Sequence, residues 1–402
     1  MDNKKSILIC SHAMEIGGAE RSLLDLLYTF DYEKYDVDLF LYRHSGEWLK
    51  DIPEKVNLLP ESDKYSSLLV PMTELIGKKQ FGLLVGRFAG RSLAKIYSKN
   101  HNFTRSAVGI EYSHKYTKSL LPKINPGKKY DLAISFLTPH YFVAEKVSAD
   151  KKIAWIHTDY SKVTVDVLSE QKMWEPYDNI ISISDAVTKS FVKVFPKLKS
   201  KVVVIENILP EKLIRRQAEE FSVSEEMPEG AIRLLSIGRY CFQKNFDSVP
   251  FICKLLLKKG INIRWYIIGF GSDEELIRKR IVENQMQDFV IILGKRKNPY
   301  PYIKECDIYI QPSRYEGKSV TVREAQLLGK PVIITSYTTA SSQLEAGVDG
   351  IIVPLDNQEC ADGIAALIRD KERMRDLSRN CRKKDYTNYL EVNKVYKMLQ
   401  EK

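Results

Sequence analysis

Short apolar runs alternate with amphipathic helical patterns along almost the whole chain. This alternation is typical of parallel β-sheets whose strands are connected by helices. The runs form two series of predicted strands, at residues 6–10, 37–42, 130–136, 152–157, 179–184 and 201–207, and at residues 232–238, 263–269, 289–294, 307–313, 331–337 and 350–354. The pattern therefore predicts an α/β protein with two doubly wound, Rossmann-like domains.

The two series are separated by residues 208–230, a polar and charged segment without a predicted strand, which we take as the connection between the domains. We expect an N-terminal domain at residues 1–207 and a C-terminal domain at residues 208–384. A last helix at residues 385–402 is expected to pack back toward the N-terminal domain. The chain of 402 residues is long enough for two domains, because single cores usually stop growing at roughly 250–300 residues.

The formal net charge of +10 is concentrated in one part of the N-terminal domain. Residues 64–129 contain thirteen Lys and Arg against two acids, Glu74 and Glu111, a surplus of eleven. This predicts a basic helical insertion near residues 61–129. Its anionic partner would be a membrane surface or a nucleic acid, although a solvated basic face has the same composition. Because no nucleic-acid-binding motif is recognisable, we expect no nucleic-acid partner.

Within the insertion, an apolar stripe at helical spacing lies beside a ridge of cations. The stripe consists of Phe81, Leu84, Val85 and Phe88, and the ridge of Arg87, Arg91, Lys95 and Lys99. Glycines at 82, 86 and 90 each cost about 1 kcal/mol of helix propensity. Two interpretations stay open: the stripe docks on an anionic membrane, or it packs into the domain core while the cations are solvated.

The cysteines and the apolar runs indicate a cellular compartment. The six cysteines are scattered without a C-x-x-C pair, and the start of the chain turns apolar too briefly for a signal peptide. No run approaches the roughly 18 apolar residues of a membrane span. We therefore expect a reduced, cytoplasmic protein that is at most peripheral on the inner face of the cell membrane.

Ligands of doubly wound sheets bind beyond the carboxyl ends of the strands, so residues directly after predicted strands are the candidate site residues. Arg239 and Lys244 follow the first strand of the second domain, and such a pair suits the adjacent phosphates of a diphosphate. Two solvated cations are the alternative. In the first domain, Gly17 and Gly18 precede a helix whose free N–H groups suit a phosphate, with a plain turn as the alternative. Their spacing is not G-x-G-x-x-G, which counts against a nicotinamide enzyme.

The segment YEGKSVTVREAQLLGKPV at residues 315–332 carries two glutamates, Glu316 and Glu324. One interpretation is a capped helix, in which Thr321 and Glu324 form a T-x-x-E capping box and a glycine and a proline end the helix. This interpretation does not explain Glu316, Gly317 and Lys318. A carboxylate before a glycine-containing bend at a strand end can accept hydrogen bonds from sugar hydroxyls, so the ligand and capping interpretations both stay open.

His157 and Asp159 follow a buried strand of the first domain. A histidine at a strand end with an aspartate two residues on would face the ligand crevice, and a packed or surface histidine is the alternative. No His, Cys and Asp cluster has metal-ligand spacing, and the chain has no Asp-x-Asp. We therefore expect neither a metal ion nor a cofactor.

Taken together, these residues resemble the family 4 glycosyltransferases, which are retaining nucleotide-sugar enzymes of the GT-B fold. The most specific part of the resemblance is the pair of glutamates within its Pro-Ser, Glu-Gly and Gly-x-Pro-Val frame. The resemblance covers the second domain nearly throughout and the first in patches. Its segments are GGAER at 17–21, ISISDAVTKSF at 181–191, VIEN at 204–207, IGR with Arg239 and Lys244, IIGFG at 267–271, ILG at 292–294 and PSRYEGKSVTVREAQLLGKPVI at 312–333.

The resemblance implies an active site in the cleft between the domains, with catalytic roles for four residues. Arg239 and Lys244 would hold the diphosphate of the donor, and Glu316 would hold the hydroxyls of its sugar. His157 would lie near the donor sugar and the acceptor, with Asp159 as a further residue on the acceptor side. The other donor-binding positions would be the ribose ligand Glu324 and Gly17, Gly18, Gly269, Gly317, Lys318 and Ser319.

One departure from the family concerns the residues after Glu316-Gly317. Many members carry an aromatic residue there, whereas this chain has Lys318 and Ser319. The departure leaves the identity of the donor sugar open.

The implied function is metal-independent transfer of a hexose-like sugar from a nucleotide-diphosphate donor, commonly a UDP-sugar in this family. The acceptor would be a growing glycan on a lipid carrier, as in bacterial capsule, exopolysaccharide or O-antigen assembly. The alternative is a non-catalytic scaffold of the same fold that binds an anionic polymer or a membrane through its basic segment.

Overall fold

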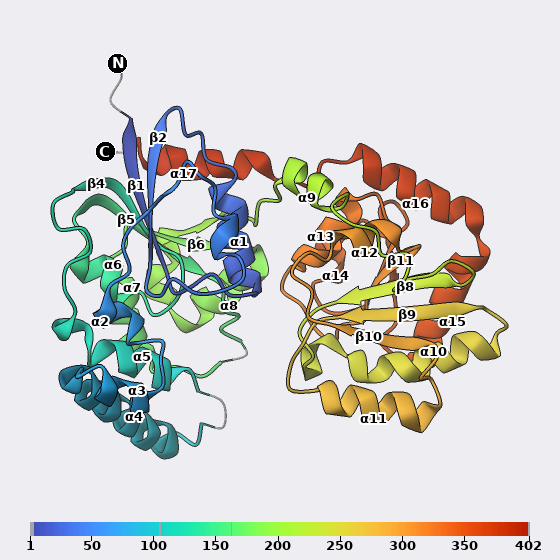
Figure 1. Cartoon of the computed structure of the whole chain (residues 1–402), viewed down its shortest axis with the longest axis horizontal. Helices are drawn as coiled ribbons and strands as arrows, with labels where there is room; N and C mark the ends of the chain where they lie inside the picture. The colour runs from blue at the N-terminus through green and yellow to red at the C-terminus, as the bar shows by residue number, and fades with distance from the viewer. Residues whose placement is uncertain (1–3, 104–105, 162, 401–402) are drawn as a thin grey trace. The chain divides into compact units, whose positions relative to one another are not determined.

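The computed structural model describes residues 4–103, 106–161 and 163–400 (Figure 1). The chain divides into two compact units, both α/β as predicted. Unit 1 runs up to Ile208 and also contains the segment from Tyr389 onward, and unit 2 is Leu209–Asn388. The division falls one residue after the predicted boundary at 207, and the returning C-terminal segment begins four residues later than predicted.

Unit 1 is built on one parallel sheet of seven strands in the order β3-β2-β1-β4-β5-β6-β7. All six predicted strands of this unit form, and the two-residue β3 is added because so short a strand leaves no apolar run to recognise. The strands are β1 (Lys5–Ser11), β2 (Tyr35–Leu41), β3 (Asn57–Leu58), β4 (Tyr130–Ser135), β5 (Ala149–Ile156), β6 (Asn179–Ser182) and β7 (Val202–Val204).

Successive strand residues point to opposite faces of the sheet. Alternate residues of β1 lie in two different cores, so both faces of this sheet are buried. Ile7 and Ile9 pack in one core with α1 (Gly18–Leu27) and the C-terminal helix α17 (Val392–Met398). Leu8 and Cys10 pack in the other core, which contains Tyr65 and Leu83 of the basic insertion and side chains of three further helices. These are α6 (Tyr141–Lys146), α7 (Val167–Trp174) and α8 (Asp185–Val194).

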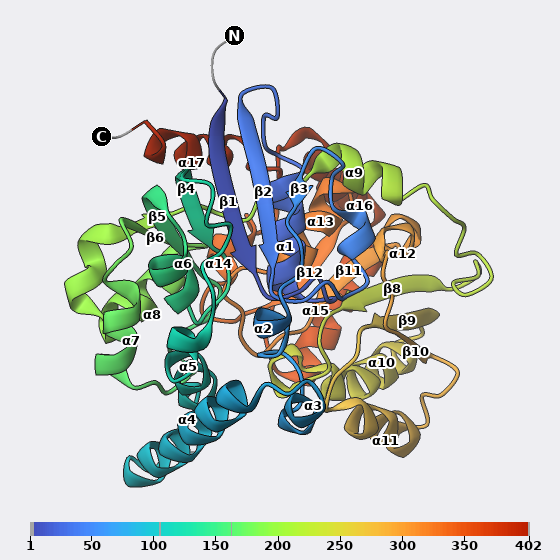
Figure 2. The same ribbon diagram turned by 60° about the vertical axis from the view of Figure 1, so that its left-hand side comes forward.

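The basic insertion forms four helices that gather at one end of the unit 1 sheet in Figures 1 and 2. Its longest helix, α4, has an apolar stripe that does not enter the core, since Phe81, Val85 and Phe88 are exposed. The interpretation that this stripe packs inside the domain is therefore wrong. The helices are α2 (Asp63–Ser66), α3 (Met72–Gly77), α4 (Phe81–Asn100) and α5 (Val108–Lys115).

The buried face of α4 contains Leu83, Arg87, Gly90 and Ala94. Arg87, predicted as a member of the exposed basic ridge, is 3% exposed, and its Nη1 donates to the carbonyl oxygens of Ser67 and Val70 at 2.7 and 2.8 Å. Burial of a cation is tolerated here because carbonyl acceptors replace water. The prediction for Arg87 is therefore wrong.

The glycines of α4 allow it to approach α5 closely. A Cβ at Gly86 would lie 2.8 Å from the carbonyl oxygen of Tyr116, and one at Gly90 would lie 2.6 Å from that of Tyr112. Gly86 and Gly90 lower the helix propensity of α4, but they allow its backbone to pack directly on the backbone of the segment around α5.

Unit 2 is built on one parallel sheet of six strands in the order β10-β9-β8-β11-β12-β13. All six strands predicted for this domain form, each shorter than or equal to its apolar run. They are β8 (Ile232–Ile237), β9 (Ile263–Ile268), β10 (Val290–Gly294), β11 (Ile308–Gln311), β12 (Val332–Thr335) and β13 (Ile351–Val353).

The unit 2 sheet is also covered on both faces. Leu234 packs in a core with α10 (Val249–Lys258), α11 (Glu274–Asn284), α15 (Asn357–Arg369) and α16 (Lys371–Lys383). Leu235 packs in the opposite core with α9 (Glu211–Gln217), α12 (Tyr300–Glu305), α13 (Val320–Leu327) and α14 (Ala340–Gln343).

Residues 209–230 are part of unit 2 rather than a free connection. Leu209, Ile214, Val223 and Met227 are buried in the second core of unit 2. The charged residues between them hid these apolar positions in the sequence pattern.

The six cysteines are free, and five of them are buried. None of the helices in the described ranges is long and apolar enough to cross a membrane.

Candidate active site

The strand order of unit 2 reverses between β8 and β11, which are neighbours in the sheet. Ligands of doubly wound sheets bind beyond the carboxyl ends of the strands at such a switch point. The loops that follow these two strands carry Arg239, Lys244 and Glu316. The predicted ligands of the diphosphate and of the sugar therefore lie on adjacent loops at one edge of the sheet.

Glu316 is held by three donors from these two loops. Its Oε1 accepts hydrogen bonds from Lys244 Nζ at 2.6 Å and from Ser313 Oγ at 2.7 Å, and its Oε2 accepts one from Gln243 Nε2 at 3.1 Å. The side chain of Glu316 is 7% exposed. The structure therefore brings Glu316 and Lys244 together as a largely buried, charge-assisted pair with a fixed orientation.

Lys244 reaches Glu316 across the end of β8. It ends the short 3-10 turn Phe242–Lys244, and its aliphatic stem lies on Gly238, where a Cβ would be 3.0 Å from Lys244 Cε. An ammonium has three N–H donors, and Glu316 is its one partner among the residues the structure describes. Arg239 is exposed on the same loop, without an ion pair in the described ranges. Both cations can thus donate to an anionic ligand.

A second ion pair ties the two loops together. Arg314 Nη1 and Nη2 donate to Asp247 Oδ1 and Oδ2 at 2.9 and 2.8 Å, and the backbone N–H of Arg314 donates to the carbonyl oxygen of Gln243 at 2.8 Å. The Arg314 guanidinium also lies 4.2 Å from the ring centroid of Phe242. The sequence pattern did not reveal this pair, because its only signal was opposite charges on two loops expected to be adjacent.

Glu324 does not form the predicted capping box. The first residue of α13 is Val320 and its N-cap is Ser319, so Thr321 lies inside the helix. Glu324 is 3% exposed, and its Oε1 accepts a hydrogen bond from Tyr300 Oη at 2.6 Å. The capping interpretation is therefore wrong for Glu324, whose carboxylate is buried against a tyrosine.

Thr321 instead contacts a buried polar chain behind Glu316. Tyr309 Oη lies 2.8 Å from both Thr321 Oγ1 and Gln311 Oε1, and Gln311 Nε2 donates to Ser313 Oγ at 2.9 Å. Burial raises the pKa of Tyr309, so its hydroxyl keeps the proton that it donates. Ser313 in turn donates to Glu316. The chain therefore helps to fix the position of the Glu316 carboxylate.

Gly317, Lys318 and Ser319 continue the same loop as Glu316, and Gly317 lies at a bend. The backbone N–H of Ser319 donates to Gln343 Oε1 at 2.6 Å, and Gln343 Nε2 donates back to the Ser319 carbonyl oxygen at 3.2 Å. Contact between this N–H and a donor phosphate would require Gln343 to move. Gln343 is therefore a further residue of the candidate site at the carboxyl edge of the unit 2 sheet, and nothing in the sequence around it indicated this position.

Gly269 follows β9 on a neighbouring loop and has a structural reason to be glycine. Its φ is +151°, and a Cβ there would lie 1.9 Å from the carbonyl oxygen of Gly238. Gly271 approaches the carbonyl oxygen of Tyr240 in the same way, at 2.3 Å. The glycines let the β9 loop pack directly on the loop that carries Arg239 and Lys244.

The other predicted site residues belong to unit 1. Gly17 is the N-cap of α1, and Gly18 is its first residue. A Cβ at Gly17 would lie 2.2 Å from Glu20 Oε2, so the carboxylate of Glu20 lies close to the Gly17 backbone. The acidic side chain also complements the helix dipole at the position proposed for a phosphate.

His157 directly follows β5, and Asp159 lies two residues on. The His157 ring packs against Phe136 with 4.6 Å between centroids, and burial lowers its pKa to about 3. Its imidazole is therefore neutral at neutral pH. It lines a small cavity of about 20 Å³ with Trp155 and Trp174. Asp159 Oδ1 accepts from the backbone N–H of Ser161 at 2.9 Å, which is a local turn contact.

Two further histidines lie at the switch point of the unit 1 sheet. His12 follows β1 and His140 lies after β4. Burial lowers the pKa of His12 to about 4 and that of His140 well below its usual value. The signal for His12 in the sequence was its position two residues after the predicted strand at 6–10.

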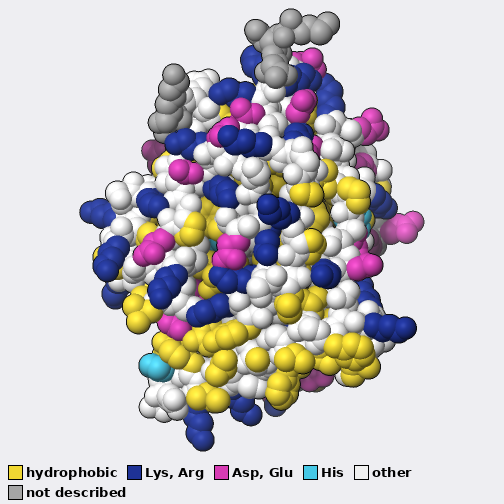
Figure 3. Space-filling model, turned by 90° about the vertical axis from the view of Figure 1, so that its left-hand side faces the viewer, with side chains coloured by type: hydrophobic (Ala, Val, Ile, Leu, Met, Phe, Trp, Pro, Cys, Tyr) yellow, Lys and Arg dark blue, Asp and Glu magenta, His cyan; other side chains and the backbone are white. Residues whose placement is uncertain are grey.

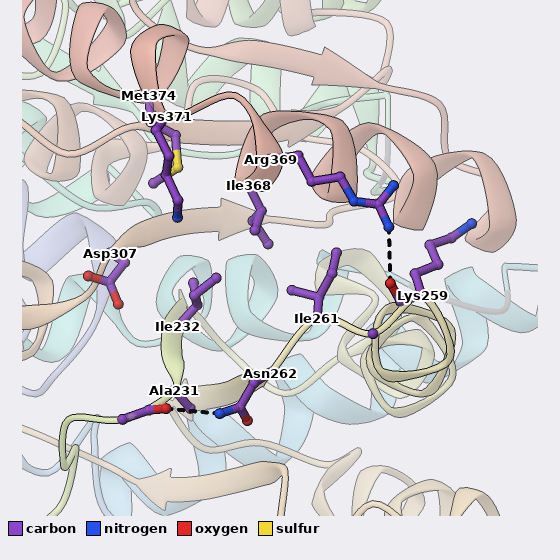
Figure 4. A pocket seen from close by; sticks show the side chains of 12 residues that line it. Ala231, Ile232, Lys259, Ile261, Asn262, Asp307, Ile368, Arg369, Lys371 and Met374 are labelled. Carbon is purple, nitrogen blue, oxygen red and sulfur yellow. Dashed lines mark hydrogen bonds between the residues drawn. The ribbon is translucent and has the colours of Figure 1, made fainter.

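A pocket lies at the opposite edge of the unit 2 sheet, at the amino ends of its strands (Figure 4). It measures about 640 Å³, and Ile232, Ile261 and Ile368 point toward one another within it. Arg369 Nη2 donates across one side to the Lys259 carbonyl oxygen at 3.0 Å. The pocket contains none of the predicted site residues. Among the described residues, no group of three or more His, Cys, Asp and Glu side chains could hold a metal ion.

Each of the two units thus has a parallel, doubly wound sheet with polar side chains at the carboxyl ends of its strands. Residues 217–384 match the family described as glycosyl transferases group 1. This match covers most of unit 2 and confirms the predicted resemblance.

Two curated relatives match parts of the chain. An uncharacterized glycosyltransferase of Methanocaldococcus jannaschii is 24% identical over 212 residues, which are 50% of this chain and 52% of the relative. The amylovoran biosynthesis glycosyltransferase AmsK of Erwinia amylovora is 26% identical over 145 residues, which are 34% of this chain and 35% of the relative. The chain therefore spans about half, or less, of the length of these relatives.

Among solved structures, Anabaena HepE in complex with UDP-glucose has a similar fold. The TM-score is 0.67 at 15% sequence identity, and the match covers 98% of this chain and 99% of HepE. This likeness confirms the predicted fold class.

Proposed function

We propose that this protein transfers a sugar from a UDP-sugar donor to a growing glycan. The observation that carries the proposal is the Lys244–Glu316 pair, 2.6 Å apart at the carboxyl edge of unit 2, beside the exposed Arg239. These residues lie within the segment that matches the glycosyl transferase family. The donor assignment is supported by the UDP-glucose bound to HepE, and the biosynthetic role by the name of the Erwinia relative.

The proposed chemistry begins with the bond between the anomeric carbon and the diphosphate oxygen. As this bond breaks, negative charge grows on the leaving UDP and positive charge grows on the sugar. Arg239 and Lys244 would stabilise the leaving diphosphate with fixed cations. Glu316, already neutralised by Lys244, would accept hydrogen bonds from the sugar hydroxyls.

We further propose that the configuration at the anomeric carbon is retained. Both oxygens of Glu316 already accept hydrogen bonds, so this carboxylate is held for orientation rather than for attack on the sugar. The acceptor hydroxyl would attack from the side of the departing UDP, and its proton would pass to the leaving phosphate oxygen. His157, whose imidazole is neutral, would serve as a hydrogen-bonding residue near donor and acceptor.

A panel of nucleotide sugars tests the proposal. The purified chain is incubated with UDP-glucose, UDP-N-acetylglucosamine, UDP-galactose and GDP-mannose, first alone and then with glycan acceptors, and nucleotide release is measured. We expect UDP release from at least one UDP-sugar and an axial, retained linkage in the product by NMR. Failure of every donor to release its nucleotide under all conditions would contradict the proposed activity, and an inverted linkage would contradict the proposed stereochemistry.

A further inference from the structure

Helix α4 presents large apolar side chains to solvent along one face. Phe81, Val85 and Phe88 are 58%, 67% and 64% exposed, and Leu93 and Ile96 continue the face at 40% and 55%. Figure 3 shows hydrophobic side chains gathered along the lower edge of the molecule, where Figures 1 and 2 place α4. Contiguous exposed apolar side chains of this size mark an interaction surface.

The exposure of this face is fixed by the opposite face of the helix. Gly86 and Gly90 pack against backbone carbonyls of the segment around α5, and Arg87 donates to two carbonyl oxygens beneath the helix. Rotating α4 to bury the apolar side chains would break these hydrogen bonds and drive Phe88 into the space that only glycine fits. The helix therefore holds its apolar face outward.

Cations border the apolar face. Arg91, Lys95 and Lys99 are exposed on α4, and in the described part of the chain no acidic side chain pairs with them. Lys78 and Lys79 are exposed just before the helix. Of the two acids within residues 64–129, Glu111 is buried, and Glu74 is exposed on α3 rather than on α4. Figure 3 shows Lys and Arg side chains along the same edge as the hydrophobic ones.

The charge pattern selects the kind of partner. In a symmetric pair of chains joined through α4, the three helix cations of one copy would meet like charges of the other, which opposes association. Lysine is also depleted from protein interfaces. A helix with large apolar residues on one side and Lys and Arg beside them suits the interface of an anionic bilayer, where the apolar side chains enter the acyl region and the cations meet the headgroups.

We propose that α4 lies in the plane of a bilayer that contains anionic phospholipid, with Phe81, Val85, Phe88 and Ile96 inserted and Arg91, Lys95 and Lys99 on the headgroups. Unit 1 is thereby attached to the membrane surface. This proposal stands apart from the proposed sugar transfer, since it concerns a surface of unit 1 and needs no donor.

Flotation of the full chain with lipid vesicles tests the proposal. Vesicles of phosphatidylcholine alone are compared with vesicles that also contain phosphatidylglycerol, each at low and high salt. We expect flotation with the anionic vesicles at low salt, a steep loss at high salt and little flotation with phosphatidylcholine alone. Equal flotation with both vesicles, or none with either, would overturn the proposal.

Two variants and a matched control identify the surface. Arg91→Gln/Lys95→Gln/Lys99→Gln should lower the vesicle partition coefficient about a hundredfold, because each cation near an anionic surface contributes roughly 1 kcal/mol. Phe81→Ser/Val85→Ser/Phe88→Ser should also lose flotation. The control removes three exposed lysines elsewhere on unit 1, as Lys193→Gln/Lys197→Gln/Lys199→Gln. An equal loss in this control would show unspecific attraction and reject the assignment to α4.

Light scattering and UDP affinity complete the test. The proposal predicts that the serine variant keeps the molar mass and the UDP affinity of the wild type while flotation is lost. A wild-type dimer that becomes a monomer in the serine variant, without flotation of either, would assign the surface to a second copy and overturn the proposal. UDP affinity is measured separately, so failure of the proposed sugar transfer would be recognised on its own.

Discussion

Glu316 and Glu324 lie eight residues apart and have different surroundings. Glu316 is paired with Lys244 at the edge of the sheet, and three donors orient it. Glu324 is buried on α13 and accepts from Tyr300. The first arrangement presents a neutralised carboxylate beside exposed or partly exposed cations. The second raises the question whether Glu324 also binds the donor ribose, as the family resemblance implies.

We predict that Glu324→Gln weakens UDP binding while the fold is kept. The amide oxygen of Gln can still accept from Tyr300, but its charge is gone, and hydrogen bonds to charged groups contribute roughly 1.5–3 kcal/mol. Isothermal titration with UDP should show the affinity lower by about tenfold or more.

Tyr300→Phe is the matched control for Glu324→Gln. It removes the hydroxyl that donates to Glu324 but leaves the carboxylate, so the thermal midpoint should fall while UDP affinity changes less than in Glu324→Gln. Should Glu324→Gln bind UDP as tightly as the wild type, the role of Glu324 is structural and its assignment to the ribose fails.

At the scale of elements, α4 shows why a helix can be predicted while its buried face is not. Its apolar spacing predicted a helix correctly. The pattern alone placed Arg87 on the basic ridge. It also allowed the apolar stripe to pack in the core, because large apolar residues are usually buried. In the structure, small residues make the contact with the segment around α5, and a guanidinium satisfies buried carbonyls. Neither contact has a signal in hydrophobic periodicity.

We predict opposite effects for two alanine substitutions in α4. Gly90→Ala should destabilise unit 1 by about 1–3 kcal/mol, because its Cβ would lie 2.6 Å from a backbone carbonyl oxygen that must shift. Gly82→Ala should stabilise by up to about 1 kcal/mol, since its nearest contact is Leu120 Cδ1 at 3.6 Å and alanine favours the helix.

Denaturant unfolding at neutral pH measures both changes, with wild-type and Gly82→Ala curves as references. Stabilisation by Gly90→Ala equal to that by Gly82→Ala would mean that α4 does not pack closely on the segment around α5. The outward orientation of its apolar face would then lose its structural basis.

At the scale of the whole molecule, the two sheets could be predicted because their strands are buried on both faces. Such strands appear as nearly continuous apolar runs, so β1, β4, β8 and β11 were recognisable without any alignment. The candidate site was predictable in part for the same reason, since Arg239, Lys244 and Glu316 lie in the loops after β8 and β11. The two-residue β3 and the buried positions within 209–230 carry no such pattern.

The remaining site residues depend on contacts between loops. Arg314 and its ion-pair partner Asp247 are 67 residues apart in the sequence. Gln343 accepts a hydrogen bond from the backbone N–H of Ser319, which lies 24 residues earlier. These loops have no periodicity, and the partner of each side chain is fixed only when the sheet brings the loops together. For this reason the sequence pointed to Glu316 and Lys244 but not to the residues that hold them in place.

The central claim is that Lys244, held by its pair with Glu316 in unit 2, binds the diphosphate of the donor, and UDP affinity tests this claim most directly. Isothermal titration compares the full wild-type chain with Lys244→Ala and with Lys258→Ala, an exposed lysine at the end of α10. Thermal unfolding verifies that all three are folded. The account predicts that UDP binds the wild type and Lys258→Ala equally, and that Lys244→Ala loses about tenfold or more, as expected for one charge-assisted contact. Equal UDP affinity of Lys244→Ala and the wild type, or no UDP binding by the wild type, would contradict it.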